Sequence, residues 1–245
     1  MRVFNAEFGH NYGVYSFGYA TYAKLAVGDD PTRAYEAGFL PKSNDPRVLN
    51  LFYMARSARA RVRDFSPTSE NRRVFKKFDG AFSSDYMKRD TLAADENFQR
   101  FFIAYFAERH GEAVMPAERL YGILQTPLPL RGVCYRKDGA PAAYVLEAAH
   151  GDWMHYWFSA YDSSYAHTGL GMWLMQDALR RAADEKRRFL YLGTAYGDKG
   201  RYKTNIAPLE FWDGETWNDD IRRLKRLIKE DAERGISFGD RLKEK

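Results

Sequence analysis

Residues 130–196 decide the fold, and they read LRGVCYRKDGAPAAYVLEAAHGDWMHYWFSAYDSSYAHTGLGMWLMQDALRRAADEKRRFLYLGTAY. Asp138-Gly139 separates two β-rich runs, which is a strong short signal for a hairpin. A third strand, DWMHYWFSAY, follows, and the turn at 169–171 leads into an amphipathic helix from Met172. The apolar strand FLYLGTAY ends the stretch. This order predicts an α/β protein with a mixed central sheet flanked by helices.

Upstream of this stretch the pattern changes twice. Residues 90–110 place aromatic and apolar side chains at helical spacing, which predicts one helix. Residues 50–65, NLFYMARSARARVRDF, alternate instead, which predicts a strand with one apolar face and one strongly basic face. The apolar face is Ala58, Ala60 and Val62, and the basic face is Arg59, Arg61 and Arg63. Ser66-Pro67-Thr68 breaks the strand, and residues 68–78 begin a helix that carries Arg72, Arg73, Lys76 and Lys77.

The composition excludes several classes of protein. The 245 residues are 45% hydrophobic and 29% charged, with a net charge of +5 and a pI near 9.1, which is typical of a mildly basic globular protein. A single cysteine, Cys134, rules out an intramolecular disulfide and a cysteine metal cluster. No apolar run approaches the roughly 20 residues that a membrane helix needs. The first residues show no signal-peptide pattern, so we expect a cytoplasmic protein without a membrane partner.

The order hairpin, strand, glycine turn, helix, strand resembles the core of the GNAT acyltransferases. In that family an Arg or Gln stands three residues before the first glycine of the turn, and the backbone amides of the turn bind a pyrophosphate. Here Ala166 occupies the Arg or Gln position, while Gly169, Leu170 and Gly171 keep the turn. The turn favours an acyl-CoA-dependent N-acetyltransferase, with acetyl-CoA as the cofactor, and Ala166 counts against it.

Residues 191–217, YLGTAYGDKGRYKTNIAPLEFWDGETW, resemble the C-terminal block of the arginyl- and leucyl-tRNA–protein transferases. The shared features are a Tyr-Leu-Gly strand, a Lys-x-x-Tyr-Lys turn, a Pro-x-Glu and a closing Trp, with Gly200 in the place of the family's Met. Three further segments resemble the family in the same order: AYEAGFLPKS (34–43), FSPTSENRRVFKK (65–77) and FSAYDSSYAHTGLGMWLMQDAL (158–179). The resemblance therefore runs from about Phe8 to Trp217.

The chain departs from this family at its cysteines. The stretches that match the Cys-Gly-Tyr-Cys and Cys-Arg-Ala-Cys blocks read Phe8-Gly9-His10-Asn11 and Ala55-Arg56-Ser57-Ala58. All four potential ligands are replaced, so we expect no metal or cluster. Ser69 replaces the arginine of the family's Pro-Ser-Arg motif, and Ser163 a proline.

The resemblance implies transfer of leucine or arginine from aminoacyl-tRNA to the N-terminal amine of a protein that begins with Asp or Glu. The ester of aminoacyl-tRNA is already activated, so no cofactor is expected. The implied catalytic residues are Tyr202, Glu210 and Tyr161. The implied substrate-binding residues are Asp162, Gly169, Leu170, Gly171, Tyr191, Gly193 and Lys203. The implied tRNA-binding residues are Arg72, Arg73, Lys76, Lys77, Lys199 and Arg201. Arg59, Arg61 and Arg63 extend this tRNA-binding surface, bind the acidic acceptor residue or form a plain exposed sheet face.

Three parts are expected along the chain: an N-terminal α+β part over residues 1–80, a GNAT-like part over 81–218, and a C-terminal helix and tail over 219–245. Besides the acetyltransferase alternative, the lost cysteines and Ser69 are compatible with a non-catalytic RNA- or degron-binding relative. The sequence leaves open whether leucine or arginine is the donor, which N-termini are accepted, which group takes the proton and how many chains assemble.

Overall fold

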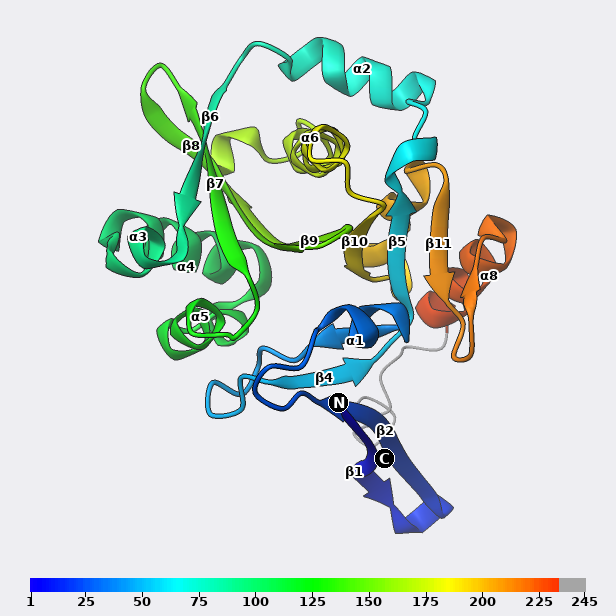
Figure 1. Cartoon of the computed structure of the whole chain (residues 1–245). Coiled ribbons are helices and arrows are strands. Elements are labelled where there is room, and N and C mark those ends of the chain that lie inside the picture. The colour runs from blue at the N-terminus through cyan, green and yellow to red at the C-terminus, as the bar shows by residue number, and fades with distance from the viewer. Residues whose placement is uncertain (234–245) are drawn as a thin grey trace.

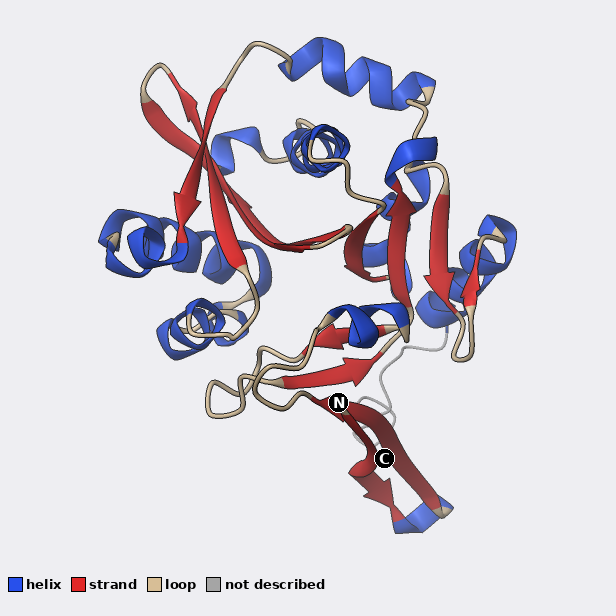
Figure 2. Cartoon of the chain, in the orientation of Figure 1, coloured by secondary structure: helices blue, strands red, loops and turns tan. Residues whose placement is uncertain are grey.

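The computed structural model describes residues 1–233. Residues 234–245, the expected tail, lie outside the described residues. Two sheets organise the described chain (Figure 1): a large one at the centre of the molecule and a small N-terminal one beside it. Helices cover both faces of the large sheet, as Figure 2 shows. The predicted α/β architecture is confirmed.

The large sheet has the strand order β12-β11-β5-β10-β9-β8-β7-β6. Its strands are β5 (Ser57–Arg61), β6 (Ser83–Lys88), β7 (Leu130–Lys137), β8 (Ala140–His150), β9 (Trp153–Tyr161), β10 (Phe189–Thr194), β11 (Leu209–Trp212) and β12 (Trp217–Asn218). β9 and β10 are parallel, and the other neighbours are antiparallel, so the predicted mixed sheet is present. The predicted hairpin joins β7 and β8, with φ of 51° at Asp138 and 81° at Gly139, as a two-residue turn of the I′ type requires.

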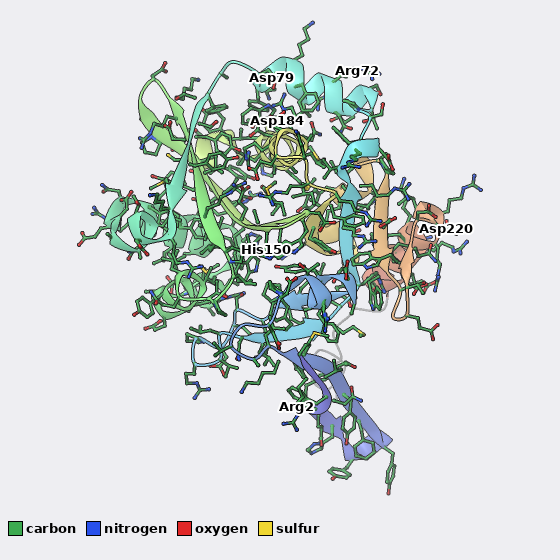
Figure 3. All side chains as sticks on the ribbon, in the orientation of Figure 1. Arg2, Arg72, Asp79, His150, Asp184 and Asp220 are labelled. Atoms are coloured by element: carbon green, nitrogen blue, oxygen red, sulfur yellow. The ribbon has the colours of Figure 1, made fainter. Side chains whose placement is uncertain are left out.

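Two helices cover one face of the large sheet. α6 (Leu170–Asp184) lies against the strands, and α2 (Ser69–Phe78) packs on α6 (Figure 1). Thr68 caps α2, because its hydroxyl accepts from the Asn71 amide at 3.2 Å while the Asn71 side chain accepts from the Thr68 amide at 2.9 Å. Asp79, labelled in Figure 3, accepts from Trp173 Nε1 of α6 at 2.8 Å and so ties the end of α2 to α6. The predicted helices are confirmed here.

The opposite face is covered at the β6–β8 end by α3 (Arg89–Ala94), α4 (Glu96–His110) and α5 (Ala117–Leu124). The single helix expected over 90–110 is therefore wrong. The chain breaks at Asp95, whose carboxylate accepts from the Asn97 and Phe98 amides at 2.9 and 3.1 Å and begins α4. Phe98, Phe102 and the leucines of α5 are buried between these helices and the sheet.

The small sheet has the order β1-β2-β4-β3, formed by β1 (Arg2–Asn11), β2 (Ser16–Lys24), β3 (Phe39–Pro41) and β4 (Leu51–Met54). The β1–β2 hairpin projects away from the body (Figure 1). α1 (Thr32–Glu36) joins the small sheet to the large one, because buried Tyr35 packs with its ring centroid 4.3 Å from that of Trp153 on β9. This contact places the small sheet beside the diverging strands described below.

The strand expected over residues 50–65 is two strands in two sheets. β4 belongs to the small sheet, whereas β5 lies between β11 and β10 in the large sheet. A short 3-10 turn at Val62–Asp64 follows β5. Because β5 and α2 belong to the main body, the expected boundary at residue 80 does not coincide with the division between the sheets. After β10 the chain forms α7 (Gly197–Arg201), β11, β12 and α8 (Ile221–Glu233), the last as predicted.

Candidate active site

A cavity opens where two parallel strands diverge. β9 and β10 pair over only three positions, from Phe189 with Trp153 to Tyr191 with His155. Beyond these positions the two strands separate, and residues of both line a cavity of about 1180 Å³. α4, the small sheet and the first turn of α6 complete its wall. Typical small-molecule sites occupy roughly 300–1,000 Å³, so this cavity accepts a ligand of at least nucleotide size.

The glycine turn lies at the wall of this cavity. Gly169 adopts φ +94°, a left-handed conformation that glycine tolerates, and begins the 15-residue α6. A Cβ on Gly171 would lie 3.2 Å from Cε1 of Tyr161, so a side chain there would press on that ring. Both glycines line the cavity. The free amide groups of a helix N-terminus attract anions, so the turn suits an anionic ligand.

Two residues expected to bind substrate do not line the cavity. Leu170 is 1% exposed and packs in the core under α6, because the first turn of this helix already buries its apolar face. Asp162 caps the 3-10 turn at Ser163–Tyr165 through the Ser164 amide at 2.8 Å and does not line the cavity. Interaction with the Ser164 side chain, and after it this amide bond, lower the pKa of Asp162. Neither residue lines the cavity, and their expected role in substrate binding stays a prediction.

The cavity wall carries only one sign of charge. Its basic and imidazole side chains are Lys42, Arg109, His110, Arg119, His155, His167, Lys199 and Lys203. Among the residues described, no Asp or Glu lines the cavity. The pKa of His110 is lowered, first by burial and then by the nearby charges of Lys199 and Arg109. A wall of this kind selects an anionic ligand and disfavours a cationic one.

Tyr202 and Lys203 follow α7 and face the cavity. Lys203 is 7% exposed, and its Nζ donates to the carbonyl oxygen of Thr194. Because burial disfavours the ammonium form, the pKa of Lys203 is lowered to about 8. The Tyr202 hydroxyl stays neutral, since desolvation raises its pKa to about 12. The cavity thus holds a lysine able to exchange a proton near neutral pH, beside a tyrosine that donates a hydrogen bond.

Tyr161 of β9 lies beside another tyrosine, Tyr105 of α4. Their ring centroids are 4.9 Å apart. Burial raises the pKa of Tyr105, and the neighbouring Tyr161 side chain raises it further. Both residues line the cavity next to Gly171. Sequence reasoning missed Tyr105, because it adjoins the phenylalanine stripe of α4 and reads as part of the core.

Glu210, an expected catalytic residue, does not line the cavity. Its carboxylate accepts from Arg59 Nε at 2.7 Å and from Arg61 Nη1 at 3.1 Å. Tyr191, an expected substrate-binding residue, lies in the same layer, 1% exposed, and accepts from Arg59 Nη1 at 3.3 Å. Burial raises the pKa of Tyr191 to about 12. Both residues hold strands together and do not line the cavity, so their expected roles stay predictions, whereas Gly193 does line the cavity.

The basic face expected for β5 is also wrong, because Arg59 and Arg61 are paired with Glu210. Ala58 and Ala60 do face the apolar core, as the alternation predicts. Arg59, however, is 8% exposed, with its guanidinium 3.8 Å from the ring centroid of Phe189 and 4.0 Å from that of Trp217. Arg61 pairs with Glu210 and Asp64, and Arg63 is exposed in the turn after β5. These arginines form no common surface.

The basic helix α2 leads to the cavity. Arg72, Arg73, Lys76 and Lys77 are exposed, and Figure 3 shows Arg72 on the outer side of α2. Lys77 Nζ donates to the carbonyl oxygen of Thr168 at 2.8 Å, directly before the glycine turn. Of the remaining two basic residues predicted to bind tRNA, Lys199 lines the cavity, and Arg201 is exposed on α7.

Residues 1–233 contain no group of three or more His, Cys, Asp or Glu side chains placed to hold a metal ion. Within the same residues, no helix has the length and apolar character that a membrane span requires.

Comparison with known proteins agrees with this geometry. The family model described as acetyltransferase (GNAT) domain matches residues 53–204, more than half of the chain. An aspartate/glutamate leucyltransferase of Cereibacter sphaeroides is 28% identical over 176 residues, which cover 66% of this chain and 61% of the relative. A second one from that organism is 28% identical over 174 residues, covering 66% and 60%. This chain therefore matches about three fifths of the length of these relatives.

Among solved structures, the crystal structure of FemX superimposes with a TM-score of 0.50 at 10% identity, over 86% of this chain and 73% of FemX, which supports the fold alone. The family model, the sheet with its diverging parallel strands and the curated relatives agree. The chain belongs to the GNAT acyltransferase family and is a relative of the aspartate/glutamate leucyltransferases.

Proposed function

We propose that the protein transfers an amino acid from aminoacyl-tRNA to the N-terminal amine of an acceptor protein, and that leucine is the amino acid. The observation that carries the proposal is the cavity of about 1180 Å³ whose described wall has eight basic or imidazole side chains and no carboxylate. The 3′ end of a tRNA is anionic and its aminoacyl-adenosine is of the size that such a cavity accepts. The name of the relatives supports leucine as the donor.

The reaction forms one bond and breaks one. The neutral α-amine of the acceptor attacks the ester carbonyl carbon, the amide C–N bond forms, and the ester C–O bond to the ribose breaks. The amine loses a proton, and the departing ribose oxygen gains one. Tyr202 and Tyr161 line the cavity, and in this proposal their hydroxyls donate to the oxygen on which negative charge develops. The remaining rate enhancement comes from holding amine and ester together.

Lys203 is the proposed proton carrier, because the described cavity wall offers no carboxylate for that role. With a pKa of about 8, a substantial fraction of Lys203 is neutral near physiological pH and able to accept the proton from the attacking amine. The ammonium that results can pass a proton to the ribose oxygen. Gly193, whose Cα lies close to Lys203, leaves room for the amine; a Cβ there would lie 3.6 Å from Lys203 Nζ.

We assign the tRNA acceptor stem to α2. Arg72, Arg73, Lys76 and Lys77 would contact phosphates, and Lys77 connects this helix with the glycine turn through Thr168. Lys199 at the cavity wall and Arg201 on α7 would continue the path of the RNA backbone. The reaction needs no further cofactor, because the ester is already activated, and it belongs in the cytoplasm, where charged tRNA is available.

A second candidate function rests on the glycine turn itself. The amide groups at the start of α6 suit the pyrophosphate of an acyl-CoA, as in acetyltransferases. Ala166 removes the side chain that usually assists this contact. We therefore rank acyl-CoA-dependent N-acetylation below aminoacyl transfer.

The test incubates the pure protein with radiolabelled leucyl- or arginyl-tRNA and peptides that begin with Asp, Glu, Lys or Ala. Label from leucyl-tRNA should move into the Asp and Glu peptides. Label from arginyl-tRNA alone would keep the reaction and overturn the donor. No transfer from either tRNA, together with acetylation of a peptide from labelled acetyl-CoA, would replace the proposal with the second candidate.

A further inference from the structure

Arg119 of α5 is an arginine in the cavity wall that has no acidic partner within residues 1–233. Its Nη2 donates to Ser43 Oγ at 2.9 Å, and its Nη1 donates to the carbonyl oxygen of Val114. The guanidinium carbon lies 5.8 Å from the ring centroid of Phe158 on β9. These contacts fix the orientation of the side chain, and only two of its five N–H donors are used in them.

No described carboxylate neutralises the charge of Arg119. Within residues 1–233, no Asp or Glu forms an ion pair with it, whereas buried Arg59 and Arg181 each pair with a carboxylate. Partial burial lowers the pKa of Arg119, because the surroundings disfavour its charged form. Holding a desolvated cation without a counter-ion costs free energy, and an anionic ligand would recover that cost.

The neighbours of Arg119 favour a carboxylate. Lys42, Ser43 and Asn44, which follow β3, line the cavity together with Arg119 and supply an ammonium, a hydroxyl and an amide. The planar guanidinium fork matches a carboxylate in geometry. Aromatic side chains from β4 and β9, Tyr53 and Trp157, line the same cavity and limit access of water.

This subsite is separate from the glycine turn. Arg119 stacks near Phe158, whereas the turn meets Tyr161, three residues further along β9. Three strand residues span about 10 Å. The basic helix α2 contacts the turn through Lys77 and Thr168, so RNA phosphates approach from that side. Arg119 is thus left for a second anionic group, on the acceptor.

We propose that Arg119 binds the side-chain carboxylate of the acceptor's N-terminal Asp or Glu, with Lys42 and Ser43 as its neighbours. This inference rests on the proposed function and adds to it the residue that determines acceptor specificity. It replaces the expectation that the arginines of β5 bind this group, since Arg59 and Arg61 are already paired with Glu210.

The experiment compares wild type, Arg119→Gln and Arg119→Lys with leucyl-tRNA and peptides that differ only in an N-terminal Asp, Asn or Ala. In Arg119→Gln, kcat/KM for the Asp peptide should fall by about 100-fold, mainly through KM. The values for the Asn and Ala peptides should stay within about twofold, so the preference for Asp is lost. Arg119→Lys keeps the positive charge but lacks the planar guanidinium fork, so it should retain part of the preference for the Asp peptide.

Arg100→Gln is the matched control, because Arg100 is an exposed arginine of α4 that donates to Asn97 Oδ1 at 2.8 Å and does not line the cavity. It should behave as wild type. Filter binding of leucyl-tRNA should be equal in all variants, and melting temperatures report folding. Ser43→Ala, which frees the guanidinium of one bond, should lower the Asp preference less than Arg119→Gln.

An unchanged ratio of Asp to Ala transfer in folded Arg119→Gln would overturn the inference while the proposed function stands. A wild type that does not distinguish Asp from Ala would overturn it as well. If wild type transfers nothing to any peptide, the proposed function fails by itself. Calorimetric binding of the Asp and Ala peptides to wild type and Arg119→Gln then decides the inference separately: loss of Asp-peptide binding in the variant supports it, and equal binding refutes it.

Discussion

Glu210 Oε2 lies 2.7 Å from Arg59 Nε, and this ion pair joins β11 to β5 across residues that are far apart in the sequence. The two side chains are 12% and 10% exposed, and Trp217 covers the guanidinium. Arg61 approaches the same carboxylate at 3.1 Å. A carboxylate held this way by two arginines is occupied, so the family-like Pro-x-Glu segment serves the sheet rather than the cavity.

We expect Glu210→Ala to destabilise the protein by about 3 kcal/mol, because it leaves the buried Arg59 charge without a partner. Chemical denaturation measures this free energy of unfolding. Asp219→Ala is the matched control: Asp219 is 71% exposed and 3.8 Å from Arg61, so its loss should cost less than about 0.5 kcal/mol. A Glu210→Ala protein of full stability that has lost transfer activity would instead assign this carboxylate a direct part in the reaction.

A second prediction concerns the pH dependence of stability. Burial lowers the pKa of Lys203 to about 8, whereas a lysine in the unfolded chain titrates near ~10.4. Between these pH values the unfolded chain binds more protons than the folded protein, so the free energy of unfolding rises with pH. The full difference corresponds to about 3 kcal/mol; it is present above the unfolded pKa and is lost as the pH falls through the folded pKa.

Lys203→Met removes the titrating group and should therefore lack this rise. Denaturation of both proteins at several pH values from 7 to about 10 measures the effect. The free energy of unfolding of the variant should exceed that of wild type most at pH 7, and this difference should shrink toward pH 10. Parallel profiles would show that Lys203 titrates as an exposed lysine does. The transfer rate of wild type should rise as the pH approaches about 8, the pKa of Lys203, since the neutral Lys203 amine is the proposed proton acceptor.

The sequence predicted the elements whose signals are local. The hairpin at Asp138-Gly139 and the amphipathic pattern of α6 each depend on neighbouring residues, and the capping residue Thr68 defines the start of α2. The break at Asp95 was missed, because the aromatic spacing of α4 runs through the preceding helix and hides the cap. Local patterns therefore predict the order and type of the central elements better than the residues at which these elements begin and end.

The site was predicted less well, because its composition depends on distant segments. The alternation of β5 correctly separated its two faces, but it could not show that Trp217 and Glu210 cover Arg59. The motif match identified the turn that carries Lys203, since that turn is compact in sequence. A lone arginine in an amphipathic helix, such as Arg119, has no sequence signal; its position in the cavity arises only when α5, β9 and the segment after β3 meet.

The basic face of α2 predicts a salt dependence of tRNA binding. Each phosphate contact that is lost should reduce the slope of log affinity against log salt concentration by about 1. We expect this for Arg72→Ala and Lys76→Ala, whose side chains are exposed on α2. Binding to leucyl-tRNA at several salt concentrations measures it, with Arg100→Ala as the control, because Arg100 is exposed on α4 and does not line the cavity. Equal slopes in all three variants would exclude α2 from the RNA path.

The final prediction tests the close approach of Gly171 to Tyr161. A Cβ at residue 171 would lie 3.2 Å from Cε1 of the tyrosine, so Gly171→Val must displace the ring by a few tenths of an ångström or more and disturb its packing against Tyr105. Because misplacement of a reacting group slows the reaction, we expect kcat to fall by about tenfold.

Ala183→Val is the matched control for this change, because Ala183 is an exposed residue of the same helix. Valine there should only lower the stability of the helix slightly, through its lower helix propensity. Steady-state transfer to the Asp peptide and the melting temperature should be measured for both variants. Unaltered kcat in folded Gly171→Val would mean that Tyr161 tolerates displacement, and the hydroxyl that stabilises the developing charge would then have to come from Tyr202 alone.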